Sequence, residues 1–235
     1  MADVKKVDYD RALNQPLSLL LIMVAKDNML EMRRIVLEAS PDQRDNMACL
    51  RALVAAFPTV FANSHCSTLS ELVWYIIEEH GPPIVNELHD LLPNCLSIAV
   101  RHRGTMLHLC VKDSTVDVVK AILRVEPQLA STRCELDDCL ALHYCSSVDM
   151  VGPLVEAYPE SVNCRDKYGS TPLHYATKRL DVDVVDALLK HGAHTNIRNV
   201  YKNTPADLAS CQVPTDASRA IIEMLEDSSL TKRAV

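Results

Sequence analysis

Glycine, aromatic side chains and long apolar runs are all scarce in this sequence. Only five of the 235 residues are glycine, and 4% are aromatic. Nucleotide-binding folds need a glycine-rich phosphate loop, which five scattered glycines cannot supply. A β-sandwich or barrel needs many turns and more β-branched and aromatic residues. These shortages, with 48% hydrophobic residues, favour a helical protein with short connections.

An excess of positive charge is also missing. The net charge of −7 disfavours a protein that binds nucleic acid over its whole surface. The longest strongly apolar run, residues 17–25, is too short to span a bilayer, and the N-terminus lacks a secretory signal. Nine cysteines without a dense framework fit a reducing compartment. We therefore expect a cytoplasmic or nuclear protein without a membrane span, nucleic acid or small-molecule substrate.

A repeat of about 33 residues runs through the second half of the chain. Residues 168–176 and 201–209 match at Tyr, Thr, Pro and Ala. Weaker copies contain His108 and His143. The spacing from His108 to His143 and that from His143 to His174 are both close to this period. Each histidine follows a proline by 15 or 16 residues, the three prolines being Pro93, Pro127 and Pro159. A fixed period of this length indicates stacked structural repeats.

The segment 166–196, with its Thr-Pro-Leu-His signature at Thr171–His174, resembles one nearly full ankyrin repeat. The resemblance extends over residues 94–226. Independently, Thr171 suits a helix N-cap and Pro172 a first helical turn, which predicts a helix over 172–178. A second helix is predicted over 182–191, ending at Gly192 with a positive φ.

The predicted fold is an all-α solenoid of stacked helix-loop-helix ankyrin-type repeats with an irregular helical N-terminal part. Residues 1–93 are expected to be degenerate or capping repeats, and whether they continue the stack stays open. Residues 94–226 are expected to form the stack, with a capping helix over 217–226, and 227–235 a flexible tail. The unit around His143 lacks about three residues between its helices, so we expect an irregular stack.

Histidines and cysteines are the candidates for chemistry. The resemblance implies that His108, His143 and His174 are structural and bond the backbone near a neighbouring loop. Nothing in the sequence matches a Walker loop, an HExxH or a GxSxG motif, so we expect no enzyme and no cofactor. The acidic stretch around Asp137 and Asp138 lacks the ligand spacing of an EF-hand and is expected to be a solvated loop tip.

Three cysteines and one histidine lie close together in the sequence and form a candidate metal site: Cys134, Cys139, His143 and Cys145. Three thiolates and an imidazole can bind zinc, although no CxxC pair is present. Burial as ordinary packing residues is the favoured interpretation. A zinc- or redox-responsive regulator is one alternative function, and it requires the four side chains to converge.

The resemblance further implies a non-catalytic protein-interaction module, a scaffold or adaptor, whose concave face of loop tips and first helices binds a partner. Basic residues gather on that expected face of an acidic protein, which predicts an acidic or phosphorylated protein segment as ligand. Another alternative is a structural subunit that docks by its apolar N-terminal helices. The predicted contacts are Arg101, His102, Arg103, Lys112, Arg133, Arg165, Lys167, Tyr168, Lys178, Arg179, Arg198, Tyr201 and Lys202.

Overall fold

The computed structural model describes residues 51, 54, 73, 74, 76–78, 80–93, 95–97 and 104–231. The chain divides into two compact units, residues 1–100 and 101–235. Most of the helical N-terminal part predicted over residues 1–93 lies outside the described residues, so its arrangement stays a prediction.

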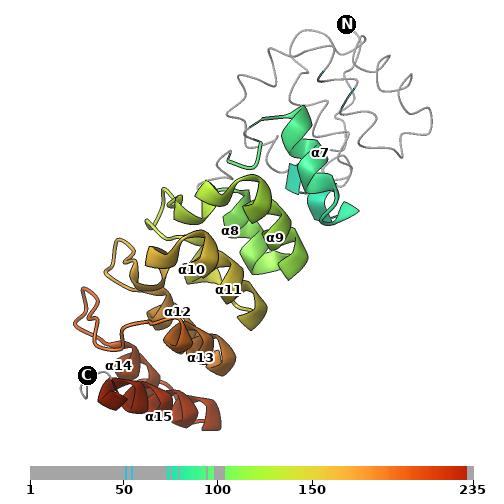
Figure 1. The fold of residues 1–235 in the computed structure, drawn as a ribbon. Coiled ribbons are helices and arrows are strands. Elements are labelled where there is room, and N and C mark those ends of the chain that lie inside the picture. The colour runs from blue at the N-terminus through green and yellow to red at the C-terminus, as the bar shows by residue number, and fades with distance from the viewer. Residues whose placement is uncertain are drawn as a thin grey trace, which may run out of the picture. The chain divides into compact units, whose positions relative to one another are not determined.

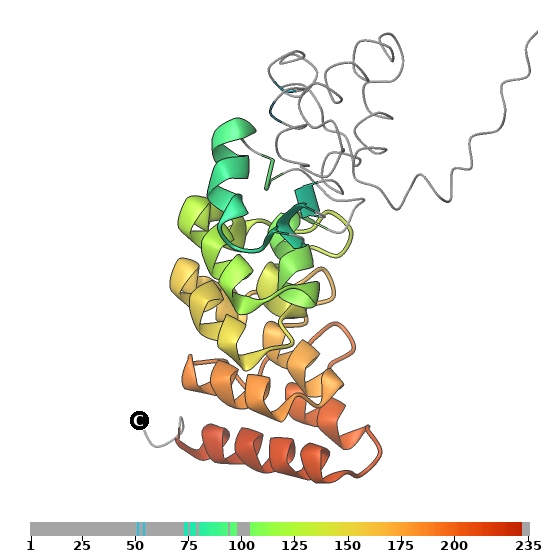
Figure 2. The same cartoon turned by 90° about the vertical axis from the view of Figure 1, so that its right-hand side faces the viewer.

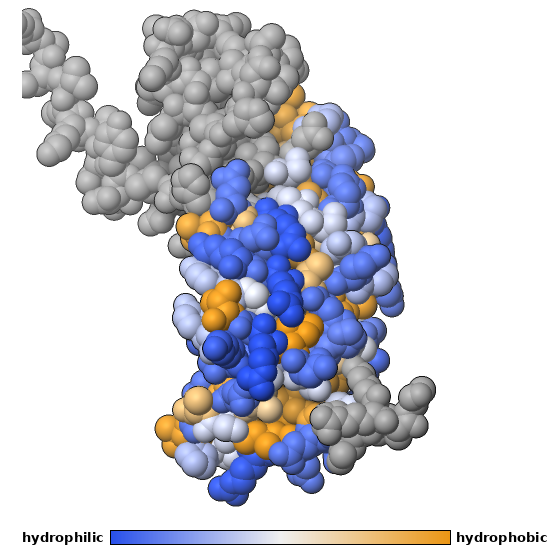
Figure 3. All heavy atoms as spheres, turned by 90° about the vertical axis from the view of Figure 1, so that its left-hand side faces the viewer, coloured by the Kyte–Doolittle hydropathy of each residue, from blue (hydrophilic) through white to orange (hydrophobic). Residues whose placement is uncertain are grey.

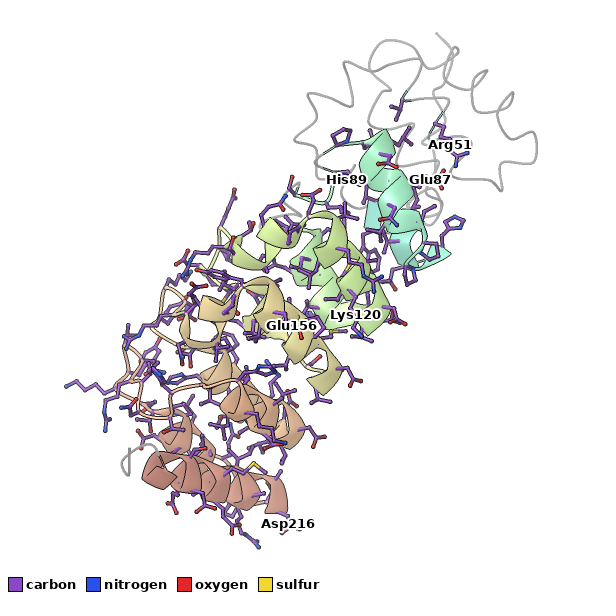
Figure 4. The ribbon with its side chains drawn as sticks, viewed as in Figure 1. Arg51, Glu87, His89, Lys120, Glu156 and Asp216 are labelled. Atoms are coloured by element: carbon purple, nitrogen blue, oxygen red, sulfur yellow. The ribbon has the colours of Figure 1, made fainter. Side chains whose placement is uncertain are left out.

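In the first unit, α7 (Ile84–Leu91) follows a Gly-Pro-Pro turn. Gly81 has a φ of +72°, a conformation that glycine adopts without a steric cost. One face of α7 is buried through Ile84, Val85 and Leu88. This helix agrees with the helical N-terminal part that the sequence predicts. Glu87 on this helix pairs with Arg51 of the same unit (Figure 4).

The second unit is a stack of four helix pairs (Figure 1). The inner helices α8, α10, α12 and α14 form one layer and the outer helices α9, α11, α13 and α15 the other, as Figure 2 also shows. No strand occurs among the residues that the structure describes. The all-α solenoid is confirmed. The pairs are α8 (Met106–Asp113) with α9 (Val116–Val125), α10 (Ala141–Tyr144) with α11 (Val148–Ala157), α12 (Pro172–Arg179) with α13 (Val182–Lys190), and α14 (Pro205–Ser210) with α15 (Asp216–Thr231).

Apolar residues at helical spacing form the core between these layers. Val184, Val185 and Leu188 are buried in α13, and Val119 and Ile122 are buried in α9. Each helix packs on the equivalent helix of the next pair as well as on its own partner. The apolar core is therefore distributed along the stack, which is how repeat proteins bury surface.

Proline and glycine end the outer helices. After α9 and α11, Pro127 and Pro159 begin short 3-10 helices, η1 (Pro127–Ser131) and η2 (Pro159–Asn163). Proline has no N–H to continue the α-helical ladder, so the chain turns there. After α13, Gly192 adopts the predicted positive φ, at +90°.

Two elements depart from the regular pattern, and the first of them is in the unit around His143 that was expected to be irregular. α10 has four residues where α8 and α12 have eight, since this repeat is shorter in sequence. The last helix runs over Asp216–Thr231, so residues 227–231 are helical and not part of a flexible tail. Its buried positions Ser218, Ile221 and Leu225 recur at helical spacing, and α13 and α14 pack against this helix. These buried positions lie within the predicted capping helix over 217–226, and the helix continues beyond them to Thr231.

Three loops project from the stack beside the inner helices, and we call them fingers (Figure 1). The first finger comprises residues 132–140, the second 164–171 and the third 197–204. Together with α8, α10, α12 and α14 they form one side of the molecule, which we call the finger face. This face corresponds to the concave face implied by the resemblance.

Gly104 supplies a direct test of the packing before α8. Its φ is +93°, and a Cβ placed there would lie 2.7 Å from the imidazole of His108. Gly104→Ala should lower the free energy of unfolding by about 3 kcal/mol, since positive φ and ring displacement both oppose the methyl group. Gly192→Ala has a φ of +90° but open space, so it isolates the backbone cost and should lose only about 1 kcal/mol. Urea unfolding measures both, and equal losses would contradict the proposed clash.

Candidate functional site

Histidines near the start of inner helices link a repeat to the next finger. The N–H of the N-cap residue donates to Nδ1 of His108, and Nε2 lies 3.2 Å from the carbonyl oxygen of Cys139. In the same way, the N-cap N–H of α12 donates to Nδ1 of His174, whose Nε2 lies 3.1 Å from the carbonyl oxygen of Asn203. Since Nδ1 accepts, Nε2 carries the proton and donates to the finger. The structural role predicted for these two histidines is confirmed.

His143 occupies the same place in α10. The N–H of Leu140 donates to its Nδ1 at 3.1 Å, and its ring meets the ring of Tyr175 edge-on at 5.4 Å. Burial lowers the pKa of His143 to about 4. Burial also lowers the pKa values of His108 and His174 below the ordinary value of 6.5. The three imidazoles are therefore neutral at pH 7, which leaves Nδ1 able to accept.

Backbone hydrogen bonds connect successive fingers. The N–H of Lys167 donates to the carbonyl of Asp137 at 3.0 Å, and the N–H of Val200 donates to the carbonyl of Tyr168 at 2.9 Å. The two bonds are equivalent to each other, because in each the N–H of one finger position bonds the carbonyl one residue after the same position of the preceding finger. The fingers therefore form a connected row along one side of the stack, with little freedom to move independently.

Two tyrosines donate hydrogen bonds to aspartates of the fingers. The hydroxyl of Tyr144 donates to the carboxylate of Asp137 at 2.6 Å, and that of Tyr175 donates to Asp166 at 2.8 Å. Asp166 is buried and also accepts two backbone N–H groups of its own finger. The expectation of a solvated acidic tip is thus wrong for Asp137, because a tyrosine hydroxyl from the adjoining inner helix reaches it. These carboxylates are compensated within the fold.

The cysteines around His143 are placed as packing residues. Among the described residues, no group of three or more His, Cys, Asp or Glu side chains is placed to hold a metal ion. Cys145 donates to the carbonyl of Ser147, and the thiol of Cys139 meets the hydroxyl of Tyr175. Burial raises the pKa of Cys139 to about 12 and that of Cys145 to about 11. Both thiols stay protonated at neutral pH, so the reactivity that a redox or nucleophilic role requires is suppressed.

Several of the predicted basic contacts are engaged within the stack. Arg133 pairs with Asp138 at 2.8 Å and donates to the carbonyl of Arg165 in the next finger. The ammonium group of Lys167 donates to the carbonyl of Leu136. Arg198 is 3.7 Å from a carboxylate oxygen of Asp207 and donates to the carbonyl of Lys202. These side chains hold fingers in place, which reduces their availability to a partner.

Arg179 caps the C-terminal end of the short helix α10 in the preceding repeat. Its guanidinium donates to the carbonyl oxygens of His143 and Cys145, at and just after the end of α10, and pairs with Asp181 at 2.6 Å. The last carbonyls of any helix lack partners within the helix. A four-residue helix has a large share of such groups, and Arg179 from the next repeat satisfies two nearby carbonyls.

The remaining basic residues form the accessible part of the predicted set. Lys112, Arg165, Lys178 and Lys202 are exposed, and no ion pair is found for their side chains among residues 104–231. Figure 3 shows the finger face, where apolar patches lie between strongly hydrophilic ones. Tyr168 is 41% exposed and Tyr201 is 68% exposed. The predicted residues Arg101, His102 and Arg103 lie outside the described part of the chain.

A cleft of about 360 Å³ lies on the finger face between the last two repeats. It brings together three residues of the predicted set, Tyr168, Lys178 and Tyr201. The second and third fingers, α12, and α14 with the residues that follow it supply its walls. The full lining is Asp166, Tyr168, Ser170, His174, Tyr175, Lys178, Asn199, Tyr201, Asn203, Leu208, Cys211 and Gln212.

Sequence reasoning missed some exposed apolar residues of the fingers. Leu136 is 62% exposed and Val200 is 61% exposed. Both occupy the finger position of Lys167. Leu136 precedes Asp137, whose carbonyl accepts from Lys167, and Val200 donates its own N–H to the carbonyl of Tyr168. Alignment of the fingers by their period would have found Val200, which precedes Tyr201 by one residue. Leu136 is harder to find because its repeat has an irregular length.

A sequence model described as ankyrin repeats (many copies) matches residues 154–209. The helix pairs, the fingers and the histidine bridges agree with that match. The chain therefore contains ankyrin repeats. In the part of the chain that the structure describes, no helix is both long and apolar enough to cross a membrane.

Three curated relatives illustrate the similarity. The BTB/POZ domain and ankyrin repeat-containing protein NPR5 of Oryza sativa subsp. japonica is 34% identical over 111 residues, covering 46% of this chain and 21% of the relative. Regulatory protein NPR5 of Arabidopsis thaliana is 36% identical over 167 residues, covering 62% and 33%. Putative ankyrin repeat protein FPV233 of Fowlpox virus is 44% identical over 55 residues, covering 22% and 11%. The chain thus spans a third or less of these relatives, and its ankyrin repeats support a protein–protein interaction module.

Arg179→Ala should destabilise the stack, because it leaves the carbonyls of His143 and Cys145 without a donor. We expect a loss of about 1–2 kcal/mol in urea unfolding. Faster amide hydrogen exchange in residues 141–147 should accompany this loss. Lys178→Ala removes the adjacent exposed cation and should change stability by less than about 0.5 kcal/mol. Equal effects of the two substitutions would contradict the capping role of Arg179.

The neutral histidines predict a loss of stability in acid. A histidine whose folded pKa is lowered binds fewer protons when folded, so stability is complete above pH 6.5 and falls until the pH reaches the folded pKa. With a folded pKa of about 4, His143 alone should cost about 2 kcal/mol between pH 7 and pH 5. His143→Gln should reduce this drop by that amount, and the exposed control His191→Gln should retain it. Urea unfolding at both pH values tests this, and an undiminished drop in His143→Gln would refute it.

Proposed function

We propose that this chain is a non-catalytic interaction module that holds an acidic segment of a partner protein on its finger face. One observation carries the proposal. The carboxylates of Asp137, Asp138 and Asp166 on this face are bonded internally, while several exposed cations of the same face have no ion pair among the described residues. The face therefore presents positive charge on a protein whose net charge is −7.

The charge argument rests on particular pairs. Asp137 accepts from Tyr144, and Asp166 accepts from Tyr175 and from two backbone N–H groups. Asp138 pairs with Arg133. Such donors reduce the negative potential that a carboxylate presents at short range. An exposed ammonium group without an ion pair presents its positive potential to an approaching partner. Complementary charge mainly raises the association rate and selects the sign of the partner.

Aromatic and aliphatic side chains on the finger face supply contact area. Tyr168 and Tyr201 are both exposed, and they lie on fingers that are held by hydrogen bonds to their neighbours. Tyrosine is enriched at interfaces because it buries a large area with few rotatable bonds. A preformed row of fingers lowers the entropy that is lost on binding. An extended segment lying across the fingers would meet cations and aromatic rings alternately.

Catalytic and metal-based alternatives have less support. Ankyrin-repeat proteins are in general non-catalytic, and the buried thiols near His143 have raised pKa values. The zinc hypothesis requires four side chains to converge, and among the described residues no such group is placed to hold a metal ion. The alternative of docking through apolar N-terminal helices depends on residues that the structure does not describe.

Charge reversal on the finger face tests the proposal. The triple variant Arg165→Glu, Lys178→Glu and Lys202→Glu should lose at least about tenfold of the captured partner, because each attraction becomes a repulsion. Affinity purification with quantitative mass spectrometry identifies and measures the partner. Raising the salt concentration should weaken capture by the wild type, since exposed charges are screened.

A matched control separates the finger face from general charge effects. Lys120, on the outer helix α9 away from the fingers (Figure 4), and Lys190, on the outer helix α13, are also exposed cations. Reversing both to Glu should leave the captured partner unchanged. Unfolding curves establish that each variant is folded. Undiminished capture by the triple variant would refute the role of the finger face.

A further inference from the structure

The cleft between the second and third fingers has walls suited to one extended side chain. Tyr168 and Tyr201 contribute aromatic rings from the two fingers, and Leu208 contributes an aliphatic group from α14. Lys178 comes from α12 and Gln212 from the segment after α14. The lining thus combines apolar surface with one ammonium group.

Electrostatics of the lining favours an anionic group. Asp166 is buried, and its carboxylate accepts the hydroxyl of Tyr175 and two backbone N–H groups. His174 is neutral at pH 7, because its pKa is lowered by burial, and both of its ring nitrogens are bonded. Lys178 is the only remaining charged side chain in the lining. Its ammonium group is therefore the only cation in the lining that can pair with a ligand.

The walls are held in place before any ligand binds. Asn199 accepts the N–H groups of Tyr201 and Asn203 on its side-chain oxygen, at 3.0 and 3.1 Å. His174 lies 3.1 Å from the carbonyl of Asn203 and so attaches the third finger to α12. The rings of the two fingers are thus carried by a connected backbone. A preformed cleft binds with a smaller loss of conformational entropy.

We infer that this cleft receives a carboxylate side chain, glutamate or aspartate, from an acidic segment of a partner protein. Lys178 pairs with the carboxylate, and Tyr168 and Tyr201 cover the carbon chain that carries it. The inference rests on the proposed function and names the point on the finger face where the segment is anchored.

A carboxylate fits this lining better than a phosphate group. Phosphate sites in proteins use arginine clusters or several free backbone N–H groups. The lining contains one lysine and no arginine, and Asp166 already occupies the backbone N–H groups of the second finger. A single ammonium group matches a single negative charge.

Disulfide capture at Cys211 measures the charge preference without knowledge of the partner. Cys211 lines the cleft and is exposed, whereas the other described cysteines are buried or half-buried. Two probes are compared, 3,3′-dithiodipropionic acid, which is anionic, and cystamine, which is cationic. The Cys211 thiolate attacks one sulfur of the probe, a mixed disulfide forms and one probe thiol leaves. Peptide mapping by mass spectrometry measures the modified fraction of Cys211 at equilibrium.

The wild type should favour the anionic probe by about fivefold, as expected for one ammonium group close to a carboxylate near the surface. Lys178→Gln should reduce the ratio to about one. Lys120→Gln, a control on α9, should leave the ratio unchanged. The net charge of −7 works against anions elsewhere on the protein, so general attraction cannot produce this preference.

A wild-type ratio of one or below, or a ratio that Lys178→Gln leaves unchanged, would overturn the inference. These results are independent of partner capture. If the triple charge reversal abolishes capture but the probes show no preference, the inference fails and the proposed function stands. If the probes show the preference but the triple variant keeps its partner, the proposed function fails, and with it the assignment of the cleft to a partner segment.

Discussion

The imidazoles of His108 and His174 each join an N–H at the start of their own helix to a carbonyl oxygen of the next finger. A finger has no sheet or helix to satisfy its backbone, so such a bridge decides where the loop lies. Burial keeps each ring neutral, and a neutral ring has one acceptor and one donor, as the bridge requires. Gly104 lies against the first ring, where only a residue without a side chain fits. The last repeat has Asp207 at this position, which bonds the N–H of Thr204.

The positions of the fingers in turn determine the charge of the finger face. Once the second finger is held, Tyr175 reaches Asp166, and Arg133 reaches both Asp138 and the backbone of the following finger. Asp137, Asp138 and Asp166 of the loops are engaged in internal hydrogen bonds and ion pairs. No ion pair is found for Lys112, Arg165, Lys178 or Lys202 among the described residues. In the proposed function, an acidic protein in this way presents a cationic face, and the cleft at Lys178 lies on that face.

Much of the stack could be predicted from the repeat pattern. Thr171 and Pro172 marked the start of α12, and Gly192 marked the end of α13, because these residue types are favoured by local backbone geometry. The helices predicted over 172–178 and 182–191 match Pro172–Arg179 and Val182–Lys190 closely. The end of α15 was predicted wrongly. Residues 227–231 are mostly polar, which is typical of a tail, yet the helix continues through them past Leu225, its last buried residue among those described.

The sequence by itself determined the repeat period, the helix starts and the structural role of the histidines, because these depend on neighbours within one repeat and on a regular translation. Only the tertiary structure decided which basic residues are available to a partner. Lys178 and Arg179 are adjacent and were predicted to act alike. Arg179 reaches back to the carbonyls of the short helix α10, whereas Lys178 lines a cleft toward the next repeat. Their roles diverge because each faces a different neighbouring repeat, and the geometry of those neighbours is not encoded in either residue.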